Sequence, residues 1–168
     1  MDNPLVGVDI LAVEDLDKEQ MLLVLDQAEQ LAQDVEARKQ ARLLRGRIMA
    51  PLFYEPDLWV RASFESAMLG LGGRVLSMSG LMGRTASEDG VALARAAQIA
   101  SGYADVIVHR HGEVFSAHEA AKGARVPLIN AGDGTYEHPT QALVSLYVMR
   151  KEKDTINGLT IALAGDLR

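Results

Sequence analysis

The sequence of 168 residues contains no cysteine. Disulfide bonds, zinc sites with thiolate ligands, iron–sulfur clusters and thiol nucleophiles are therefore excluded. Aromatic residues are also few, at 5% of the chain, whereas 48% of the residues are hydrophobic. A chain of this length and apolar content buries a sizeable core without covalent cross-links.

Long hydrophobic runs are absent as well. The longest covers residues 48–54, whereas a helix that crosses a membrane needs about twenty apolar residues. The N-terminal stretch MDNPLVGVDI has neither the basic nor the apolar region of a signal peptide. We therefore expect a cytoplasmic protein without membrane association.

Basic residues are fewer than acidic residues. The chain has 17 Lys and Arg residues against 23 Asp and Glu residues, which gives a formal net charge of −6. No stretch is dense enough in basic residues to form the cationic surface that nucleic acids require. The composition argues against broad nucleic-acid binding.

Helical and strand-like segments alternate along the chain, which is typical of an α/β protein. Apolar residues at helical spacing predict a helix from Asp17 to about Lys39, with Asp17 as N-cap and Gln20 in capping-box position. The other predicted helices cover 58–69, 90–101, 116–124 and 139–153, and the predicted strands cover 47–54, 74–78, 105–110, 126–131 and 159–165. We expect a doubly wound, mainly parallel sheet with helices on both faces.

The predicted elements also suggest a division of the chain. We expect residues 1–153 to form one domain, and residues 154–168 to form a linker and the first strand of a second domain that is truncated or absent. In doubly wound proteins, a strand such as residues 159–165 ordinarily leads through a turn into a further helix.

Two junctions between predicted elements could bind a ligand. Residues 53–61 connect a strand to a helix, where free backbone N–H groups and the helix dipole favour an anion, although Asp57 would also serve there as an ordinary N-cap. His109, Arg110 and His111 stand at the end of a predicted strand. Open α/β sheets bind ligands at such ends, and solvated basic turns are also common there.

A third candidate is the segment of residues 130–141, which contains a Gly-Asp-Gly turn. His138 and Gln141 are three residues apart at a predicted helix start and therefore project to the same side of its first turn. Such a pair beside exposed backbone donors could orient a small carbonyl compound. Alternatively, His138 serves only as a cap.

In combination, these segments resemble the aspartate carbamoyltransferases. The similarity rests on LFYEP, RASFESAM and LGG, then VIVHRH, then INAGDGTYEHPTQAL and LTIALAGDLR. NAGDG followed by EHPTQAL separates the sequence from the related ornithine enzymes. The resemblance covers that family's N-terminal, carbamoyl-phosphate-binding domain, roughly half of the usual chain.

The resemblance implies transfer of a carbamoyl group from carbamoyl phosphate to the amine of aspartate, the committed step toward pyrimidines, with no metal or organic cofactor. Family members bind the phosphate through a Ser-Thr-Arg-Thr run at the second helix, and a neighbouring subunit supplies a Ser and a Lys. By the same resemblance, Arg110, His138 and Gln141 orient the carbamoyl group, and Arg61 is mainly structural.

The phosphate half of the site departs from the family pattern. Asp57-Leu58-Trp59-Val60 stands where Ser-Thr-Arg-Thr is expected, so three hydroxyls and a guanidinium are lost and a carboxylate is added. Asp89 stands where the neighbour's lysine is expected. A hydrogen bond to a charged group contributes about 1.5–3 kcal/mol, so the loss of three removes roughly 4–9 kcal/mol if they add.

The leading hypothesis is therefore a catalytically inactive aspartate carbamoyltransferase-like protein of pyrimidine biosynthesis. It would act as a structural or regulatory subunit beside an active transcarbamoylase or another pyrimidine enzyme. One alternative is an active aspartate carbamoyltransferase with an unconventional phosphate site. Another is a transferase or binder for a different carbamoyl or amide compound that lacks phosphate.

Three structural expectations complete the hypothesis. The resemblance implies a homotrimer, with residues 80–89 reaching toward a neighbouring subunit. At the altered anion site, Asp57 is expected to cap the second helix and to fill part of the role of the phosphate. Leu58 and Trp59 are expected to close over this site and exclude water.

Overall fold

The protein contains a four-stranded sheet in which every neighbouring pair of strands is parallel. It is seen in a computed structural model that describes residues 3–37, 42–76 and 90–164. The strand order is β2-β1-β3-β4. The strands are β1 (Ile48–Phe53), β2 (Arg74–Val75), β3 (Val106–His111) and β4 (Leu128–Asp133).

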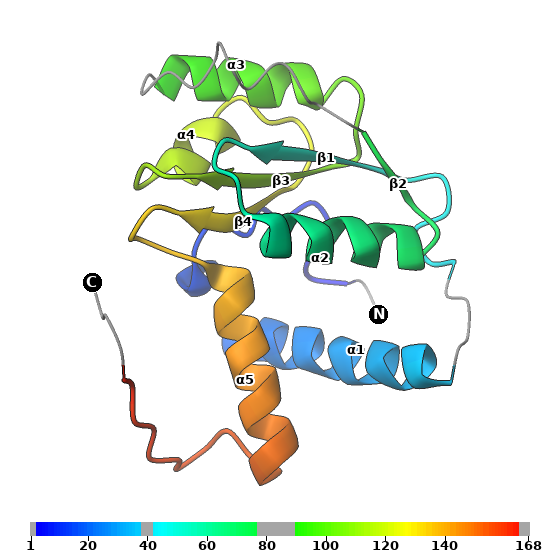
Figure 1. Ribbon diagram of the computed structural model, residues 1–168, viewed down its shortest axis with the longest axis vertical. Helices are drawn as coiled ribbons and strands as arrows, with labels where there is room; N and C mark the ends of the chain where they lie inside the picture. Colours follow the sequence, from blue (N-terminus) through cyan, green and yellow to red (C-terminus); the bar gives the residue numbers. More distant parts are fainter. Residues whose placement is uncertain (1–2, 38–41, 77–89, 165–168) are drawn as a thin grey trace.

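Helices cover both faces of this sheet, as the alternating sequence pattern predicts. In Figure 1, α3 and α4 lie on one side of the sheet and α2 lies on the other, with α1 and α5 beyond it. The helices are α1 (Lys18–Glu36), α2 (Leu58–Gly70), α3 (Gly90–Ala100), α4 (Ser116–Ala121) and α5 (Pro139–Lys153), preceded by a short 3₁₀ turn, η1 (Val13–Asp15).

Alternation along the strands divides the core into two clusters. Ala50 and Ile107 pack with the alanine-rich faces of α3 and α4. Their neighbours Met49 and Val108 face the opposite side and pack with Met68 of α2. Successive side chains of a strand point to opposite faces, so buried strands such as these need apolar residues at nearly every position.

Helix starts follow the residues that the sequence marks for them. The carboxylate of Asp17 accepts a hydrogen bond from Gln20 N at 2.8 Å, and the Gln20 side chain accepts from Asp17 N at 2.9 Å, which confirms the predicted capping box. Helix α5 begins with Pro139, which needs no hydrogen-bond partner for a backbone N–H in the first turn.

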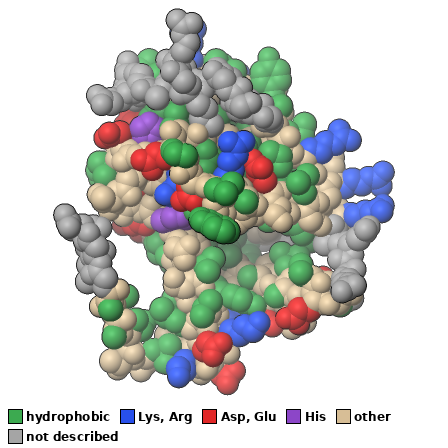
Figure 2. Space-filling model, viewed as in Figure 1, with side chains coloured by type: hydrophobic (Ala, Val, Ile, Leu, Met, Phe, Trp, Pro, Cys, Tyr) green, Lys and Arg blue, Asp and Glu red, His purple; other side chains and the backbone are tan. Residues whose placement is uncertain are grey.

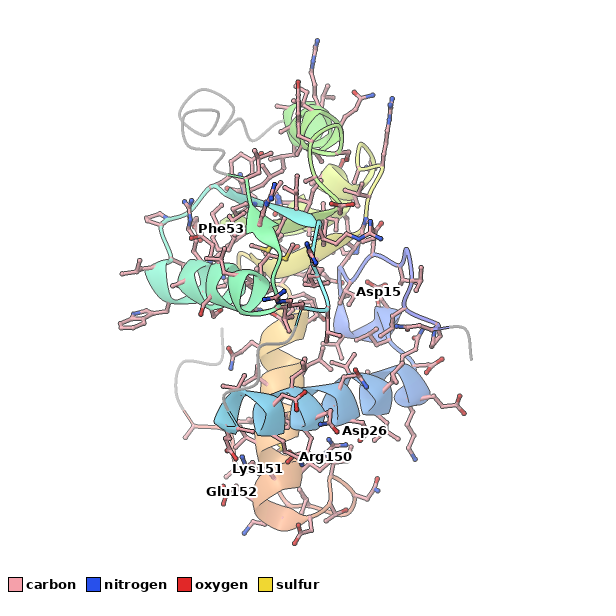
Figure 3. The ribbon with its side chains drawn as sticks, turned by 90° about the vertical axis from the view of Figure 1, so that its right-hand side faces the viewer. Asp15, Asp26, Phe53, Arg150, Lys151 and Glu152 are labelled. Atoms are coloured by element: carbon pink, nitrogen blue, oxygen red, sulfur yellow. The ribbon has the colours of Figure 1, made fainter. Side chains whose placement is uncertain are left out.

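Polar contacts join α1 to α5 (Figure 3). Tyr147 Oη donates to Glu29 Oε2 at 2.9 Å. Arg150 Nη1 lies 2.7 Å from Asp26 Oδ1, and both residues are labelled in Figure 3. None of the helices in the described part of the chain combines the length and hydropathy that crossing a bilayer requires.

The predicted strand over residues 159–165 is wrong for the residues that the structure describes. Residues 159–164 form no strand, and the side chains of Ile161 and Leu163 are exposed. A strand is stabilised by hydrogen bonds to a neighbour, and no strand of the described chain lies beside this segment. Its apolar alternation is therefore not sufficient to form a strand.

Candidate functional site

Arg110 lies near the carboxyl end of β3, in register with Phe53 at the end of β1. Its Nη1 donates to the carbonyl oxygen of Ala131 at 2.7 Å. Its Nη2 lies 3.0 Å from Asp57 Oδ2, and about four-fifths of the Arg110 side chain is buried. The guanidinium is therefore held at the carboxyl edge of the sheet, between β4 and the start of α2.

Asp57 connects this arginine to the N-terminus of α2. Its Oδ1 accepts a hydrogen bond from Val60 N at 3.0 Å, and its Oδ2 pairs with Arg110. The predicted N-cap is confirmed, whereas the ion pair was not predicted. The carboxylate therefore binds both of the groups that favour an anion here, which are the N-terminus of α2 and the guanidinium of Arg110.

His138 is the N-cap of α5 and forms the third side of the site. Its Nδ1 accepts from Gln141 N at 3.3 Å and lies 3.2 Å from Thr140 Oγ1. Burial lowers the pKa of His138, and the positive charge of Arg110 lowers it further. The neutral ring, with Nδ1 as acceptor, carries its proton on Nε2 and can donate to a carbonyl oxygen.

The Gly-Asp-Gly turn allows Arg110 and His138 to approach each other. Gly132 has φ +113°, and a Cβ atom there would collide with Arg110 Nη1 and lie 3.3 Å from His138 Cδ2. Gly134 has φ +61°, and a Cβ there would collide with the carbonyl oxygen of Gly112. Both positions favour glycine, because backbone conformation and space exclude a side chain.

The structure thus places three predicted residues around one point. Asp57, Arg110 and His138 are adjacent, and Gln141 lies in the first turn of α5. Figure 2 shows basic, acidic and histidine side chains meeting close to the start of α5. Beside them, α2 and α5 enclose a mostly apolar hollow of about 320 Å³ that is bordered by His138 and Gln141.

The expected closure by Leu58 and Trp59 is wrong. Leu58 is 74% exposed and Trp59 is 84% exposed. The inward face of α2 carries Val60, Phe64 and Met68, which recur every four residues and pack with the sheet cluster. Residues 58 and 59 fall off this stripe, because each residue of a helix turns about 100° from the last.

The structure describes one of the two remaining predicted residues, Arg61, but not the other, Asp89. Arg61 Nε donates to Glu65 Oε1 at 2.7 Å, one turn along α2, so its contact is within its own helix. Asp89 and the loop of residues 80–89 lie outside the described residues. Within the described ranges, no group of three or more His, Asp or Glu residues is placed to hold a metal ion.

His109, which the sequence marks as a candidate ligand-binding residue, lies in the core next to the site. His109 is fully buried, with Nε2 3.3 Å from Ser116 Oγ and its ring against Tyr54. Burial lowers the pKa of His109 to about 3, and His111 contributes to the shift. The alternation of β3 contains the signal, because residues 108 and 110 face the side opposite to residue 109.

Known proteins with related sequences and folds were compared with this chain. The family model for the aspartate/ornithine carbamoyltransferase carbamoyl-phosphate-binding domain matches residues 8–151. The chain is 40% identical over 159 residues to the aspartate carbamoyltransferase catalytic subunit of Methanocaldococcus jannaschii, covering 95% of this chain and 52% of that protein. It is also 40% identical to the chloroplastic aspartate carbamoyltransferase of Arabidopsis thaliana, of which it covers 41%.

Solved structures show the same similarity. Aspartate transcarbamoylase of Trypanosoma cruzi, in complex with carbamoyl phosphate and aspartate, superposes with a TM-score of 0.86 at 34% sequence identity. The superposition covers 97% of this chain and 53% of the other. The chain therefore spans about half the length of most of the relatives it matches.

Proposed function

Because this chain belongs to the aspartate/ornithine carbamoyltransferase family, through the carbamoyl-phosphate-binding domain of that family, we propose that it serves pyrimidine biosynthesis as an aspartate carbamoyltransferase-like protein. We further propose that it does not itself transfer a carbamoyl group. It acts instead as a structural or regulatory subunit, either in a homotrimer or beside an active transcarbamoylase or another pyrimidine enzyme.

The observation that supports the loss of catalysis is the pairing of Asp57 with Arg110. An incoming phosphate dianion meets a carboxylate at the helix N-terminus, where a free anion site is needed. The nearby guanidinium is already neutralised by that carboxylate. Electrostatic stabilisation of the departing group usually dominates such reactions, so repulsion at this point reduces both substrate binding and turnover.

A second candidate function is active aspartate carbamoyltransferase. It is supported by the relatives, which are named as catalytic subunits and are about 40% identical over most of this chain. It is also supported by Arg110, His138 and Gln141, which retain the residue types expected to orient a carbamoyl group. In this case, carbamoyl phosphate would displace the Asp57 carboxylate from Arg110 when it binds.

Product formation separates the two candidates. The longest natural form of the protein is incubated with carbamoyl phosphate and L-aspartate, and carbamoyl aspartate is measured. The Methanocaldococcus jannaschii catalytic subunit serves as the positive control. We expect no product above the uncatalysed rate. Turnover that disappears in Arg110→Gln would contradict the proposal and establish the second candidate.

A further inference from the structure

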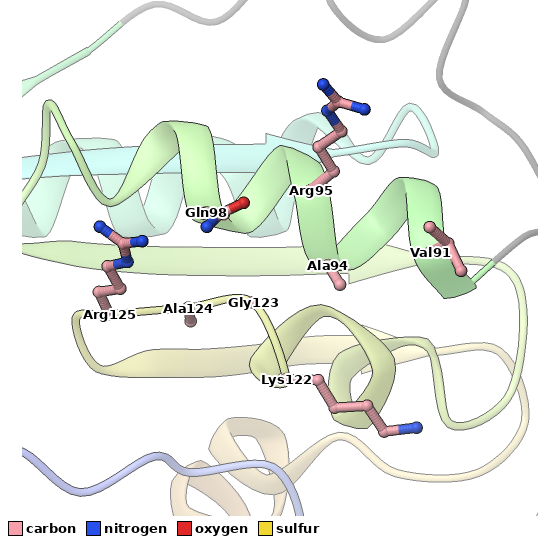
Figure 4. Close-up of a pocket in the computed structure, with 8 residues that line it drawn as sticks. All are labelled: Val91, Ala94, Arg95, Gln98, Lys122, Gly123, Ala124 and Arg125. Atoms are coloured by element: carbon pink, nitrogen blue, oxygen red, sulfur yellow. The ribbon is translucent and has the colours of Figure 1, made fainter.

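On the other face of the sheet, away from Arg110, a second cavity of about 530 Å³ lies between α3 and α4 (Figure 4). Arg95 and Gln98 line it from α3, whereas Lys122 and Arg125 line it from the end of α4 and the following turn. In Figure 4, the guanidinium groups of Arg95 and Arg125 point to the same side, and Lys122 lies on the opposite side.

The backbone around this cavity is held in place. Gly123 packs so closely on α3 that a Cβ atom there would overlap the Ala94 backbone. Ser101 Oγ accepts from Arg125 N at 2.9 Å and donates to Ala97 O at 2.7 Å, so the base of Arg125 is anchored to α3. The two cationic side chains therefore extend from a preformed rim, which reduces the ordering cost of binding.

The two arginine side chains on this rim have no ion-pair partner in the part of the chain that the structure describes. Four arginines elsewhere in the described chain are in ion pairs with acids: Arg47, Arg61, Arg110 and Arg150. In contrast, Arg95 and Arg125 make no ion pair within the described ranges. Lys122 pairs with Glu119 at 2.6 Å and contributes less. Two guanidinium groups without an ion-pair partner among the described residues therefore border one cavity, in a chain with a net charge of −6.

We propose that this cavity binds a small organic phosphate ester. Planar guanidinium groups match phosphate oxygens with paired hydrogen bonds, and two of them balance a dianion. The apolar surface of Val91, Ala94 and Ala124 provides room for an organic group, with the Gln98 amide beside it. The volume lies within the range of small-molecule sites, about 300–1,000 Å³.

The proposal is independent of the site at Asp57. The cavity shares no residue with that site, and the two core clusters separate α3 and α4 from α2. Binding here is therefore expected whether or not the protein transfers carbamoyl groups.

Calorimetric titration of the purified protein with phenyl phosphate and with inorganic phosphate tests the proposal. We expect phenyl phosphate to bind, at least tenfold more tightly than inorganic phosphate. Arg95→Gln and Arg125→Gln should each weaken binding tenfold or more. Arg74→Gln is the matched control, because Arg74 is also exposed but lies outside the cavity. It should leave the affinity unchanged.

Three outcomes would overturn the proposal. One is the absence of phenyl phosphate binding at millimolar concentration. Another is binding that survives both arginine substitutions but is lost in Arg110→Gln, which would place the ester at the start of α2. The third is binding of a poly-glutamate peptide without binding of phenyl phosphate, which would assign the rim to an acidic protein partner. Thermal melting of each variant verifies that it is folded.

Discussion

At the scale of single residues, Asp57 carries two functions that a local pattern cannot show together. As N-cap, it binds the amide of Val60, a contact set by its position before α2. As a partner of Arg110, it depends on the neighbouring positions of β1 and β3 in the sheet. The cap follows from the sequence, whereas the ion pair follows from the fold.

We expect Asp57→Ala to lower the free energy of unfolding by about 1 kcal/mol, because the substitution removes the cap. Asp57→Asn keeps an oxygen for the Val60 amide but removes the charge next to Arg110, and should cost less. Asp17→Ala is the matched control, since Asp17 caps α1 and has no ion pair with any residue that the structure describes. Urea unfolding measures all three variants. Equal stability of Asp57→Ala and wild type would show that the cap contributes nothing.

Because His109 is buried, we expect the folded protein to lose stability in acid. The pKa of His109 is about 3 in the folded protein and 6.5 ordinarily, because burial disfavours the charged ring. The unfolded chain therefore binds more protons between these values, and this contribution to stability, complete above pH 6.5, decreases as pH falls toward 3. We expect the free energy of unfolding to depend less steeply on pH between 6.5 and 4.5 in His109→Gln than in wild type.

The control for this experiment is Ser116→Ala. It removes the hydroxyl beside His109 Nε2 but leaves the buried ring, so the pH dependence should persist. The same slope in wild type and His109→Gln would show that other groups carry the acid sensitivity.

At the scale of elements, the orientation of the first residues of α2 determines whether one substitution there can restore phosphate binding. Val60 lies on the inward stripe of the helix, whereas Trp59 is almost fully exposed. An arginine at position 59 therefore begins outside the site. A threonine at position 60 adds one hydroxyl but leaves Asp57 in place.

We accordingly expect neither Trp59→Arg nor Val60→Thr to yield carbamoyl aspartate. Each adds at most a single phosphate donor, while the Asp57 carboxylate still pairs with Arg110. By the family resemblance, Asp89 also stands in place of the neighbour's lysine. We expect rescue to require the whole Ser-Thr-Arg-Thr run, a lysine at position 89 and the second domain of the family. The assay is the product measurement described above, and turnover by Trp59→Arg alone would contradict the blocked site.

At the scale of the whole molecule, we expect a closed homotrimer. The resemblance to the family implies a threefold interface built by this domain, and most soluble homo-oligomers are closed and symmetric. Leu58 and Trp59 add exposed apolar surface that a neighbouring subunit could cover. Sedimentation velocity at micromolar concentration measures the state, and a monomer would contradict the prediction.

Carbamoyl phosphate should not stabilise the folded protein through the site at Asp57. A ligand that binds only the native state raises the melting temperature, so a blocked site gives no shift. The measurement uses the double variant Arg95→Gln, Arg125→Gln, in which the cavity between α3 and α4 no longer contributes. A clear rise at millimolar carbamoyl phosphate would favour the active enzyme.

The sequence by itself determined the element order and the local starts of helices. Asp17, Asp57 and Pro139 act through hydrogen bonds or backbone angles within one turn, so their roles can be read from neighbouring residues. The parallel sheet was expected from alternating helices and strands, and Asp57, Arg110 and His138 were candidates because they lie at strand ends and helix starts.

Only the tertiary structure decided which of these residues meet and which remain in solvent. Arg110 pairs with Asp57 because β1 and β3 are adjacent. Trp59 is exposed because it does not lie on the face of α2 that packs against the sheet. Residues 159–164 form no strand, although their pattern favours one, because no described strand lies beside them. Contacts between residues distant in sequence depend on the packing of whole elements, which local patterns do not encode.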